Sequence, residues 1–266
     1  NLPFYGLAVV CADDPGVREV MGSIGRAVMT YGLDADCDIR AANVEFDAGE
    51  TRFDVIRGDD RPELSISLRL PGMHNVRNAL AAIAVAEELQ VADEAVVRAL
   101  QSFEGIDRRF QSLGEIDTGA GKVLLVDDYG HHPTEVAATI AAARTGWPDK
   151  RVVLVFQPHR YTRTRDLMDD FAQVLSEADV LVVLDVYAAG EAPIAGADGR
   201  AIARAVRSRG AVEPVFVETL AEVAPVLKDV IADGDLVLTM GAGDIGAYAT
   251  GLPALLRGRP NLKVHS

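Results

Sequence analysis

The segment of residues 123–133, VLLVDDYGHHP, most constrains how this chain can fold. An apolar run typical of a buried strand stops abruptly. Two carboxylates, a tyrosine, a glycine and two histidines follow before a proline opens a helical pattern. Packing alone does not explain so many polar side chains at one corner. In an open α/β sheet, ligands bind in the crevice outside the carboxyl ends of the strands. The segment therefore predicts an α/β sheet with a functional site at this corner.

The sequence after residue 121 alternates regularly between apolar strands and helical patterns. A second polar corner occurs where the apolar run VVLVF gives way to QPHRYTRTRD at 157–166. Continuous apolar strands joined through helices predict a parallel sheet that is covered on both faces. The expected strands lie near 122–127, 151–156, 179–184, 213–217 and 235–240. The expected helices lie near 133–145, 164–177, 198–208, 219–231 and 244–257.

The first part of the chain has a different pattern. An apolar strand at 7–11 precedes a short helix with Pro15 near its start. Three stretches of β character then predict an antiparallel meander, at 38–46, 51–58 and 63–70. The last of them alternates strictly between apolar and polar residues. Two helices follow at 75–90 and 93–103, the second expected to be capped by Asp93. The short polar segment 116–121 predicts a domain boundary, with domains at 1–118 and 119–266.

Composition excludes several classes of function. The formal net charge of −14 over 266 residues argues against a nucleic-acid partner. The sequence contains no apolar run of 18 or more residues, so we predict no membrane span. The first residues of the chain do not resemble a signal peptide. Cys11 and Cys37 have no metal or redox spacing and are interpreted as reduced thiols of a cytoplasmic protein, in preference to a disulfide. Arginines clustered in so acidic a chain indicate a bound anion.

Two corners carry the candidate chemistry. An aspartate just past a strand, such as Asp128, can hold a metal or its water, and a histidine such as His131 can transfer a proton near neutral pH. The alternative is that the aspartates cap the next helix and the histidines are solvated. At the second corner, the guanidinium groups of Arg160 and Arg163 suit a carboxylate or phosphate. The alternative there is a solvated helix N-terminus whose local partners include Asp166.

Three further motifs have weaker signals. Asn75 and Asn78 lie one turn apart at a helix start, where they could contact the edge of a base or where Asn75 could simply cap the helix. Arg108 and Arg109 stand on an expected loop, and either could meet a phosphate. The spacing G-x-G-x-x-G at 241–246 follows the last strand of the domain. A tight turn for helix packing is favoured there over a nicotinamide site.

Together, and in this order, these motifs resemble the Mur ligases of peptidoglycan synthesis, in particular the branch that joins L-alanine to UDP-N-acetylmuramate. The resemblance covers essentially the whole chain. Its motifs are GMHNVRNALAA, FEGIDRRFQSLGE, VDDYGHHPTEV, FQPHRYTRTRDL, DVYAAGEAPI and GAGDIG. It implies an α/β fold with a Rossmann-like, parallel-sheet amino-acid-binding domain. Before it would come the remainder of an α/β ATP-binding domain containing the antiparallel meander.

The chain departs from the family pattern in one respect: it has no G-x-x-x-x-G-K-[ST] phosphate loop. We therefore expect a carboxy-terminal fragment. It would lack the UDP-sugar domain, the phosphate-loop half of the ATPase domain and the Mg²⁺ ligands of that half, and it would be inactive alone. The loss of neighbouring strands would leave exposed edges in the first part, which leaves self-association of that part open.

The resemblance also implies a role for individual residues in the complete enzyme. ATP with Mg²⁺ would phosphorylate the muramoyl carboxylate, and the amine of L-alanine would attack the acyl phosphate. The implied residues are Asp128 and His131 as catalytic, Tyr129, Arg160 and Arg163 as substrate-binding, and Asn75, Asn78 and Arg109 as contacts to ATP. No metal ligand is assigned within this chain.

Two other classes of function remain as alternatives. The missing phosphate loop favours a non-catalytic module that recognises a nucleotide or amino acid. The intact arginine corner weighs against it. A dinucleotide oxidoreductase is the more distant alternative, because no acidic partner follows the glycine motif at the spacing that such a site requires.

Overall fold

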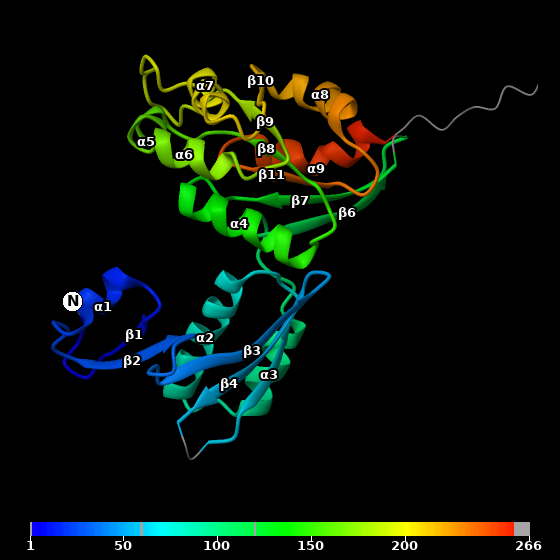
Figure 1. Ribbon diagram of the computed structural model, residues 1–266. Helices are drawn as coiled ribbons and strands as arrows, with labels where there is room; N and C mark the ends of the chain where they lie inside the picture. Colours follow the sequence, from blue (N-terminus) through cyan, green and yellow to red (C-terminus); the bar gives the residue numbers. More distant parts are fainter. Residues whose placement is uncertain (1, 59–60, 120, 258–266) are drawn as a thin grey trace, which may run out of the picture. The chain divides into compact units, whose positions relative to one another are not determined.

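The computed structural model describes residues 2–58, 61–119 and 121–257. The chain folds into two compact α/β units, drawn in Figure 1. The first comprises the residues up to 104 together with 145–147, and the second comprises 105–144 together with the residues from 148 on. The expected α/β fold class is confirmed, with one sheet in each unit. We describe each unit by itself.

The first unit has a five-stranded sheet in the order β1-β2-β3-β4-β5. Its strands are β1 (Leu7–Cys11), β2 (Ala27–Gly32), β3 (Ile39–Asp47), β4 (Glu50–Arg57) and β5 (Leu64–Leu68). The antiparallel meander is confirmed for β3, β4 and β5. However, β1, β2 and β3 pair in parallel, so the sheet is mixed. Strand β2 was not expected, because its residues are mostly half-buried and lack a clean alternation.

Three helices belong to this unit: α1 (Pro15–Met21), α2 (Met73–Glu88) and α3 (Asp93–Ser102). Helix α2 packs Leu80 and Ile83 against the apolar face of the meander. The expected cap at Asp93 is wrong, and so is the alternative that Asn75 caps its helix. Helix α2 is capped by Gly72, whose φ of 96° suits glycine, and not by Asn75. Helix α3 has Ala92 at its N-cap, because the Asp93 carboxylate is held by Arg57 instead.

The second unit has a six-stranded sheet in the order β10-β9-β8-β11-β7-β6. Its strands are β6 (Gln111–Asp117), β7 (Lys122–Asp128), β8 (Val152–Phe156), β9 (Val180–Leu184), β10 (Val215–Val217) and β11 (Leu236–Met240). Strands β7 to β11 pair in parallel as predicted. Strand β6 was not predicted. It runs antiparallel along β7 at the edge, with much of its length exposed. Ile116 and Asp117 therefore belong to β6, and the two compact units divide after residue 104.

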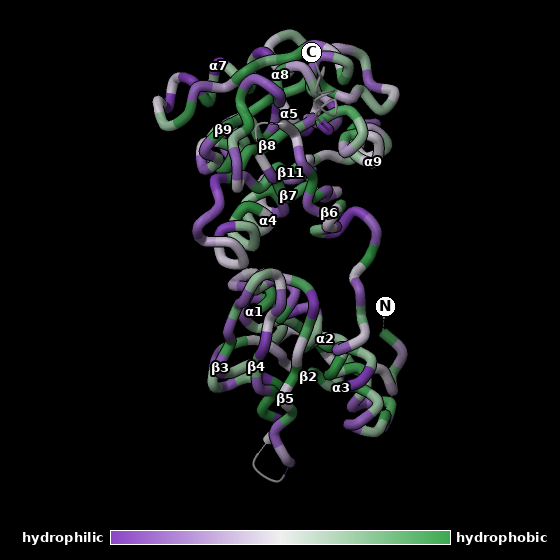
Figure 2. The backbone as a smooth tube through the Cα atoms, turned by 90° about the vertical axis from the view of Figure 1, so that its right-hand side faces the viewer, coloured by the Kyte–Doolittle hydropathy of each residue, from purple (hydrophilic) through white to green (hydrophobic). Residues whose placement is uncertain are grey.

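Helices cover both faces of this sheet, because the side chains on both faces of its central strands are buried. Val153 and Val155 pack toward α8 (Val223–Val230) and α9 (Ile245–Leu256). On the opposite face, Phe156 meets Phe171 of α6 (Met168–Leu175), with ring centroids 5.5 Å apart. The remaining helices are α4 (Pro133–Gly146), α5 (Tyr161–Asp166) and α7 (Gly199–Arg209). Figure 2 shows the hydrophobic stretches along β8 and β9.

The expected helix at 164–177 is two helices. Helix α5 starts three residues earlier, at Tyr161, and α6 begins after Leu167, whose φ of −121° interrupts the helix. The expected helix at 219–231 is likewise a short 3₁₀ turn (Leu220–Glu222) followed by α8. Within the described ranges, no helix is long and apolar enough to cross a membrane.

Candidate active site

Both predicted corners lie at one edge of the second sheet. Strands β7, β11, β8 and β9 are consecutive neighbours and all parallel, so the loops that follow them leave from the same edge. The rings of His131, after β7, and His159, after β8, are 5.7 Å apart. An isolated parallel bridge joins His159 to Tyr187, after β9. Side chains from three strand ends therefore converge.

Asp127 is a buried anchor of this edge. Its side chain is 3% exposed and accepts a hydrogen bond from Arg108 Nε at 2.9 Å. Its other oxygen accepts from Thr239 Oγ1 at 2.7 Å. Arg108 also donates to the carbonyl of Gly241, which joins the loop before β6 to the end of β11. Because these partners occupy Asp127, it does not cap α4, contrary to one alternative considered from the sequence.

Asp128 holds two backbone segments in place. One carboxylate oxygen accepts from the amide of Phe110 at 2.7 Å, and the other accepts from the amide of Gly130 at 2.7 Å. Burial raises the pKa of Asp128, although the two amides partly offset this. The carboxylate therefore fixes the loop before β6 and the turn after β7, and it is not the cap of α4.

Glu135 and His132 cap helix α4 together. Glu135 Oε2 accepts from the backbone amides of His131 at 3.0 Å and His132 at 3.1 Å. His132 Nδ1 in turn faces the amide of Thr134 at 3.3 Å. Glu135 thus reaches back to the cap as in a capping box, whereas His132 faces the second amide of the helix instead of the third. Burial alone would raise the pKa of Glu135, but the two amides and the positive side chains nearby lower it.

A row of four aromatic rings crosses the site from β7 to β9. Tyr129 contacts His131 edge-on at 5.2 Å, His131 contacts His159, and His159 stacks on Tyr187 at 5.6 Å with an interplanar angle of 10°. Arg108 and Arg109 lie over the ring of Tyr129. Burial, together with the neighbouring Arg163, His131 and Arg160, lowers the pKa of His159. The row therefore forms an aromatic wall in which only His159 and Tyr187 are coplanar, and the first two contacts are edge-on.

Arg163 lies against this wall, and Arg160 stands at its rim. Arg163 Nη1 donates to the His159 carbonyl at 3.1 Å and lies 3.2 Å from His159 Nδ1. Arg160 is exposed, and its φ of 73° is unusual for a residue other than glycine. Its amide donates to the Tyr187 carbonyl at 2.9 Å, which holds that backbone in place. Arg165, by contrast, is exposed and pairs with its neighbour Asp166 at 2.7 Å.

The glycine motif at 241–246 fits a tight packing turn, as expected. A Cβ on Gly243 would stand 2.7 Å or less from the Tyr187 side chain, and one on Gly246 would overlap the Arg108 guanidinium. Gln157, which is buried, donates to Asp244 Oδ1 at 2.6 Å and accepts from the Ile245 amide at 3.1 Å. The glycines thus let the start of α9 approach Gln157, Tyr187 and Arg108.

Sequence reasoning missed several residues of this site. Gln157, Tyr187, Glu135 and Glu191 all fall inside the motif segments, but no role was assigned to them. Glu191 accepts from both the amide and the hydroxyl of Thr162, at 3.0 and 2.7 Å, and so secures the start of α5. Only Gln157 directly follows a strand, whereas the other three stand three to seven residues past a strand end. Sequence alone cannot tell which such residues turn inward.

The structure separates the two adjacent arginines. Arg108 is committed to Asp127 and Gly241, whereas the half-exposed Arg109 reaches Glu135 only at 3.5 Å. Arg109 is therefore the better candidate of the two for a contact to phosphate.

The asparagine pair lies in the first unit. Asn75 Nδ2 donates to the Pro71 carbonyl at 2.8 Å, and its Oδ1 is 3.5 Å from Nδ2 of the exposed Asn78. The side-chain amide of Asn78, the exposed member of the pair, therefore remains accessible to a ligand.

For a metal, the described residues contain no group of three or more His, Cys, Asp or Glu side chains that could hold an ion.

Comparisons with known proteins place this geometry in a family. Residues 1–86 match the Mur ligase middle domain, and residues 108–243 match the Mur ligase glutamate ligase domain. Among solved structures, UDP-N-acetylmuramate-alanine ligase MurC from Thermotoga maritima is 30% identical, with a TM-score of 0.74 over 92% of this chain. This chain covers 50% of that protein.

Two further structures share the fold at lower identity. The murein peptide ligase Mpl from Psychrobacter arcticus is 21% identical, with a TM-score of 0.68 over 97% of this chain and 52% of its own. MurF ligase from Thermotoga maritima, in complex with ADP, is 18% identical, with a TM-score of 0.71 over 95% of this chain and 54% of its own. The chain thus spans about half the length of each of these relatives. With matches to two successive family domains, it belongs to the Mur ligase family of ATP-dependent ligases that build peptidoglycan precursors.

Proposed function

We propose that this chain forms the nucleotide- and amino-acid-binding part of a ligase that joins L-alanine to the carboxylate of UDP-N-acetylmuramate. ATP would activate the carboxylate as an acyl phosphate, and the alanine amine would displace phosphate to give the amide. The 30% identity to a ligase named for alanine supports this substrate over those of the more distant relatives. In this proposal, the enzyme works in the cytoplasm, where these precursors are made.

The observation that carries the proposal is the position of Arg163 against the aromatic row. A guanidinium matches a carboxylate in a planar, two-point contact. Arg160, three residues before it and exposed, would complete the carboxylate site. Next to Arg163, the rings of His131 and His159 lie edge-on to one another, with an interplanar angle of 62°.

His131 is the group best placed to act on the alanine amine. Its Nδ1 lies 3.1 Å from the Tyr129 carbonyl and 3.4 Å from Glu135, so that the ring orientation is fixed. The other nitrogen would remain to accept a proton from the attacking amine. We assign Asp128 a positioning role, because its oxygens hold the amides of Phe110 and Gly130.

Nucleotide contacts complete the proposal. Arg109 would approach the phosphates, and Asn75 and Asn78 would contact adenine through their amides. Mg²⁺ would neutralise charge on the transferring phosphoryl group, with ligands from outside this chain. A lysine-bearing phosphate loop is likewise not in this sequence, so we expect no ligase activity from this stretch alone.

A panel of amino acids tests the substrate. Saturation-transfer NMR on this chain, with ADP present, should detect L-alanine more strongly than D-alanine, L-glutamate or diaminopimelate. Preference for D-alanyl-D-alanine or diaminopimelate would instead assign the site to another branch of the family. If a reading frame that continues upstream of Asn1 encodes a G-K-T or G-K-S phosphate loop, the ligase is favoured over a non-catalytic binding module.

A further inference from the structure

The two arginines of the proposed carboxylate site stand at the start of helix α5, which has no cap of its own. The first amides of a helix have no acceptor within the helix, and the side chain at the N-cap usually supplies one. The N-cap of α5 is Arg160, whose side chain carries donors only and makes no capping bond. Positive charge at this end also opposes the helix dipole. The start of α5 therefore needs an acceptor and a negative charge from another element.

Glu191, in the loop after β9, supplies both. One carboxylate oxygen accepts from the amide of Thr162 at 3.0 Å, and the other accepts from the Thr162 hydroxyl at 2.7 Å. These bonds and the neighbouring charge of Arg160 lower the pKa of Glu191, so that its carboxylate is charged at neutral pH. A side chain from the next strand end thus caps α5.

A tight turn directs Glu191 back toward α5. The Glu191 amide donates to the Ala188 carbonyl at 3.0 Å, which closes the turn. The two residues between them, Ala189 and Gly190, have φ values of 50° and 85°. Positive φ at both central positions is a feature of type I′ turns and is unusual for alanine. The loop is therefore held in a conformation that presents this carboxylate to α5.

The backbone of Arg160 is strained, and the same two loops hold it. Its φ of 73° with ψ of 133° lies in a region that residues other than glycine rarely adopt. The Arg160 amide donates to the Tyr187 carbonyl at 2.9 Å, and its own carbonyl accepts from the amide and hydroxyl of Thr164, at 3.1 and 3.0 Å. Strained backbone persists only where the surrounding structure holds it, and it is concentrated at functional sites.

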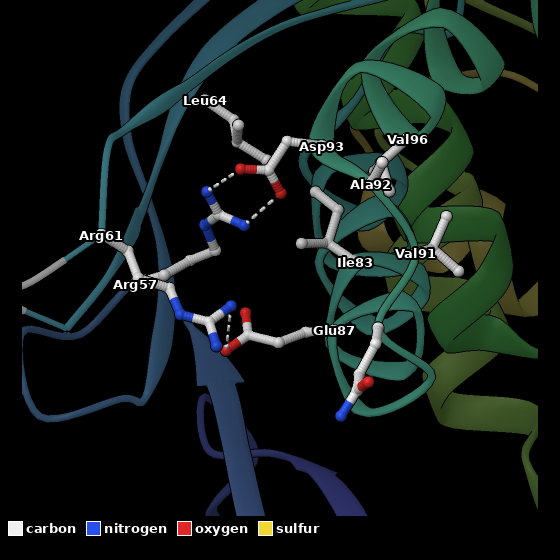
Figure 3. Close-up of a pocket in the computed structure, with 10 residues that line it drawn as sticks. Arg57, Arg61, Leu64, Ile83, Glu87, Val91, Ala92, Asp93 and Val96 are labelled. Atoms are coloured by element: carbon white, nitrogen blue, oxygen red, sulfur yellow. Dashed lines mark hydrogen bonds and ion pairs between the residues drawn. The ribbon is translucent and has the colours of Figure 1, made fainter.

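The first unit secures a helix start in a comparable way. Arg57 of β4 donates to both oxygens of Asp93, the first residue of α3, at 2.7 and 2.8 Å. Figure 3 shows this two-point contact between the strand and the helix. There the helix contributes the carboxylate, whereas at α5 the carboxylate comes from the neighbouring loop. In both units, a contact through two carboxylate oxygens fixes a helix start to another element.

We propose that Glu191 is the positioning residue of the carboxylate site. It holds the start of α5 against the loop after β9 and so fixes the directions in which Arg160 and Arg163 face the amino acid. Without it, the first amides of α5 turn to water, and the two guanidinium groups lose their fixed spacing. The inference rests on the proposed function, because that function assigns the carboxylate of L-alanine to these arginines.

Glu191→Gln tests the proposal in the full chain. The amide keeps the size of the side chain but loses the charge, and its N–H₂ group then faces one of the two Thr162 donors. The dissociation constant for L-alanine, titrated by NMR with ADP present, should rise about tenfold. Glu222→Gln is the matched control, because Glu222 likewise accepts from a hydroxyl, that of Thr219 at 2.8 Å, and from an amide, that of Glu218 at 3.3 Å. It should leave the L-alanine affinity unchanged, and equal effects of the two variants would overturn the proposal.

A second pair of variants separates positioning from a general loss of stability. Thr162→Val removes the hydroxyl at constant shape and should weaken L-alanine binding about threefold or more, whereas Thr162→Ser keeps the hydroxyl and should restore it. In Glu191→Gln, the amides of residues 161–163 should exchange with solvent faster, while those of β8 keep their protection. Faster exchange in both places would show a general loss of stability and overturn the proposal. If Glu191→Gln does not fold, the Thr162 pair decides.

The outcomes also distinguish this inference from the proposed function. An unmodified chain that binds no L-alanine would overturn the proposed function and this inference with it. If the unmodified chain, Glu191→Gln and Thr162→Val all bind L-alanine equally well, the inference alone is overturned.

Discussion

Arg108 Nε lies 2.9 Å from Asp127 Oδ2, and the same guanidinium reaches the Gly241 carbonyl and covers the ring of Tyr129. One side chain thus ties together the loop before β6, the end of β7 and the end of β11. The site edge therefore depends on a residue that we do not expect to touch the substrate.

Arg108→Ala should destabilise the second unit much more than Arg109→Ala. Removing Arg108 leaves the buried Asp127 carboxylate without its guanidinium, and breaking a buried pair costs about 3–5 kcal/mol. The lower end is expected, because a quarter of Arg108 is exposed. Arg109 is half exposed and 3.5 Å from Glu135, so its loss should cost less than about 1 kcal/mol. Hydrogen exchange of the β7 and β11 amides measures the loss of stability in each variant. Equal losses in the two variants would contradict the assignment of Arg108 as the buried partner of Asp127.

Two glycines of α9 should respond to alanine in opposite directions. A Cβ on Gly246 would overlap Arg108, whereas one on Gly251 has nothing within 4 Å. Gly251→Ala should raise the free energy of unfolding by about 0.4–1 kcal/mol, because alanine is the better helix former. Gly246→Ala should lower it. The double variant Gly246→Ala with Arg108→Ala should lose less than the sum of the two singles, and simple additivity would argue against the overlap.

His159 should make the second unit less stable in mild acid. Burial, then Arg163, His131 and Arg160, lower its pKa from the usual 6.5, while Glu191 partly opposes them. Below pH 6.5 the unfolded chain therefore binds a proton that the folded chain resists. The contribution of His159 is fully present above about pH 7.5 and is lost as pH falls through 6.5 toward the lowered value.

His159→Gln tests this direction. Between about pH 8 and pH 5.5, the free energy of unfolding of the variant should fall less than that of the unmodified chain. If the free energy of unfolding of the variant falls as much over this pH range as that of the unmodified chain, His159 is not the titrating group.

The sequence predicted the parallel sheet of the second unit well because its strands are continuous apolar runs. Strands β2 and β6 were missed, since a partly exposed strand has no such pattern and only its pairing identifies it. The two compact units divide after residue 104, because β6 pairs along β7 in the second unit. At the site, the predicted corners do meet. However, the different partners of Arg108 and Arg109 depend on tertiary geometry that adjacent, identical residues cannot reveal.

The last prediction concerns Arg163 in the active ligase. If it holds the alanine carboxylate, Arg163→Ala removes one partner of a charge-assisted pair, worth about 2–5 kcal/mol. At about 1.4 kcal/mol per decade, the apparent affinity for alanine should fall about thirty- to several-thousand-fold. The lower end is expected, because the half-buried site must open to water between turnovers. Arg163→Lys should recover only part of the loss, since an ammonium cannot make the planar two-point contact.

Arg165→Ala is the matched control, because that arginine is exposed and pairs with Asp166. It should leave the KM for alanine unchanged. Arg163→Ala also removes the donor to the His159 carbonyl, so a merely structural effect would raise the KM values for alanine and ATP together. Steady-state kinetics with each substrate varied in turn separates these cases. A raised ATP KM with an unchanged alanine KM would move Arg163 to the nucleotide, because a carboxylate contact acts on the amino acid alone.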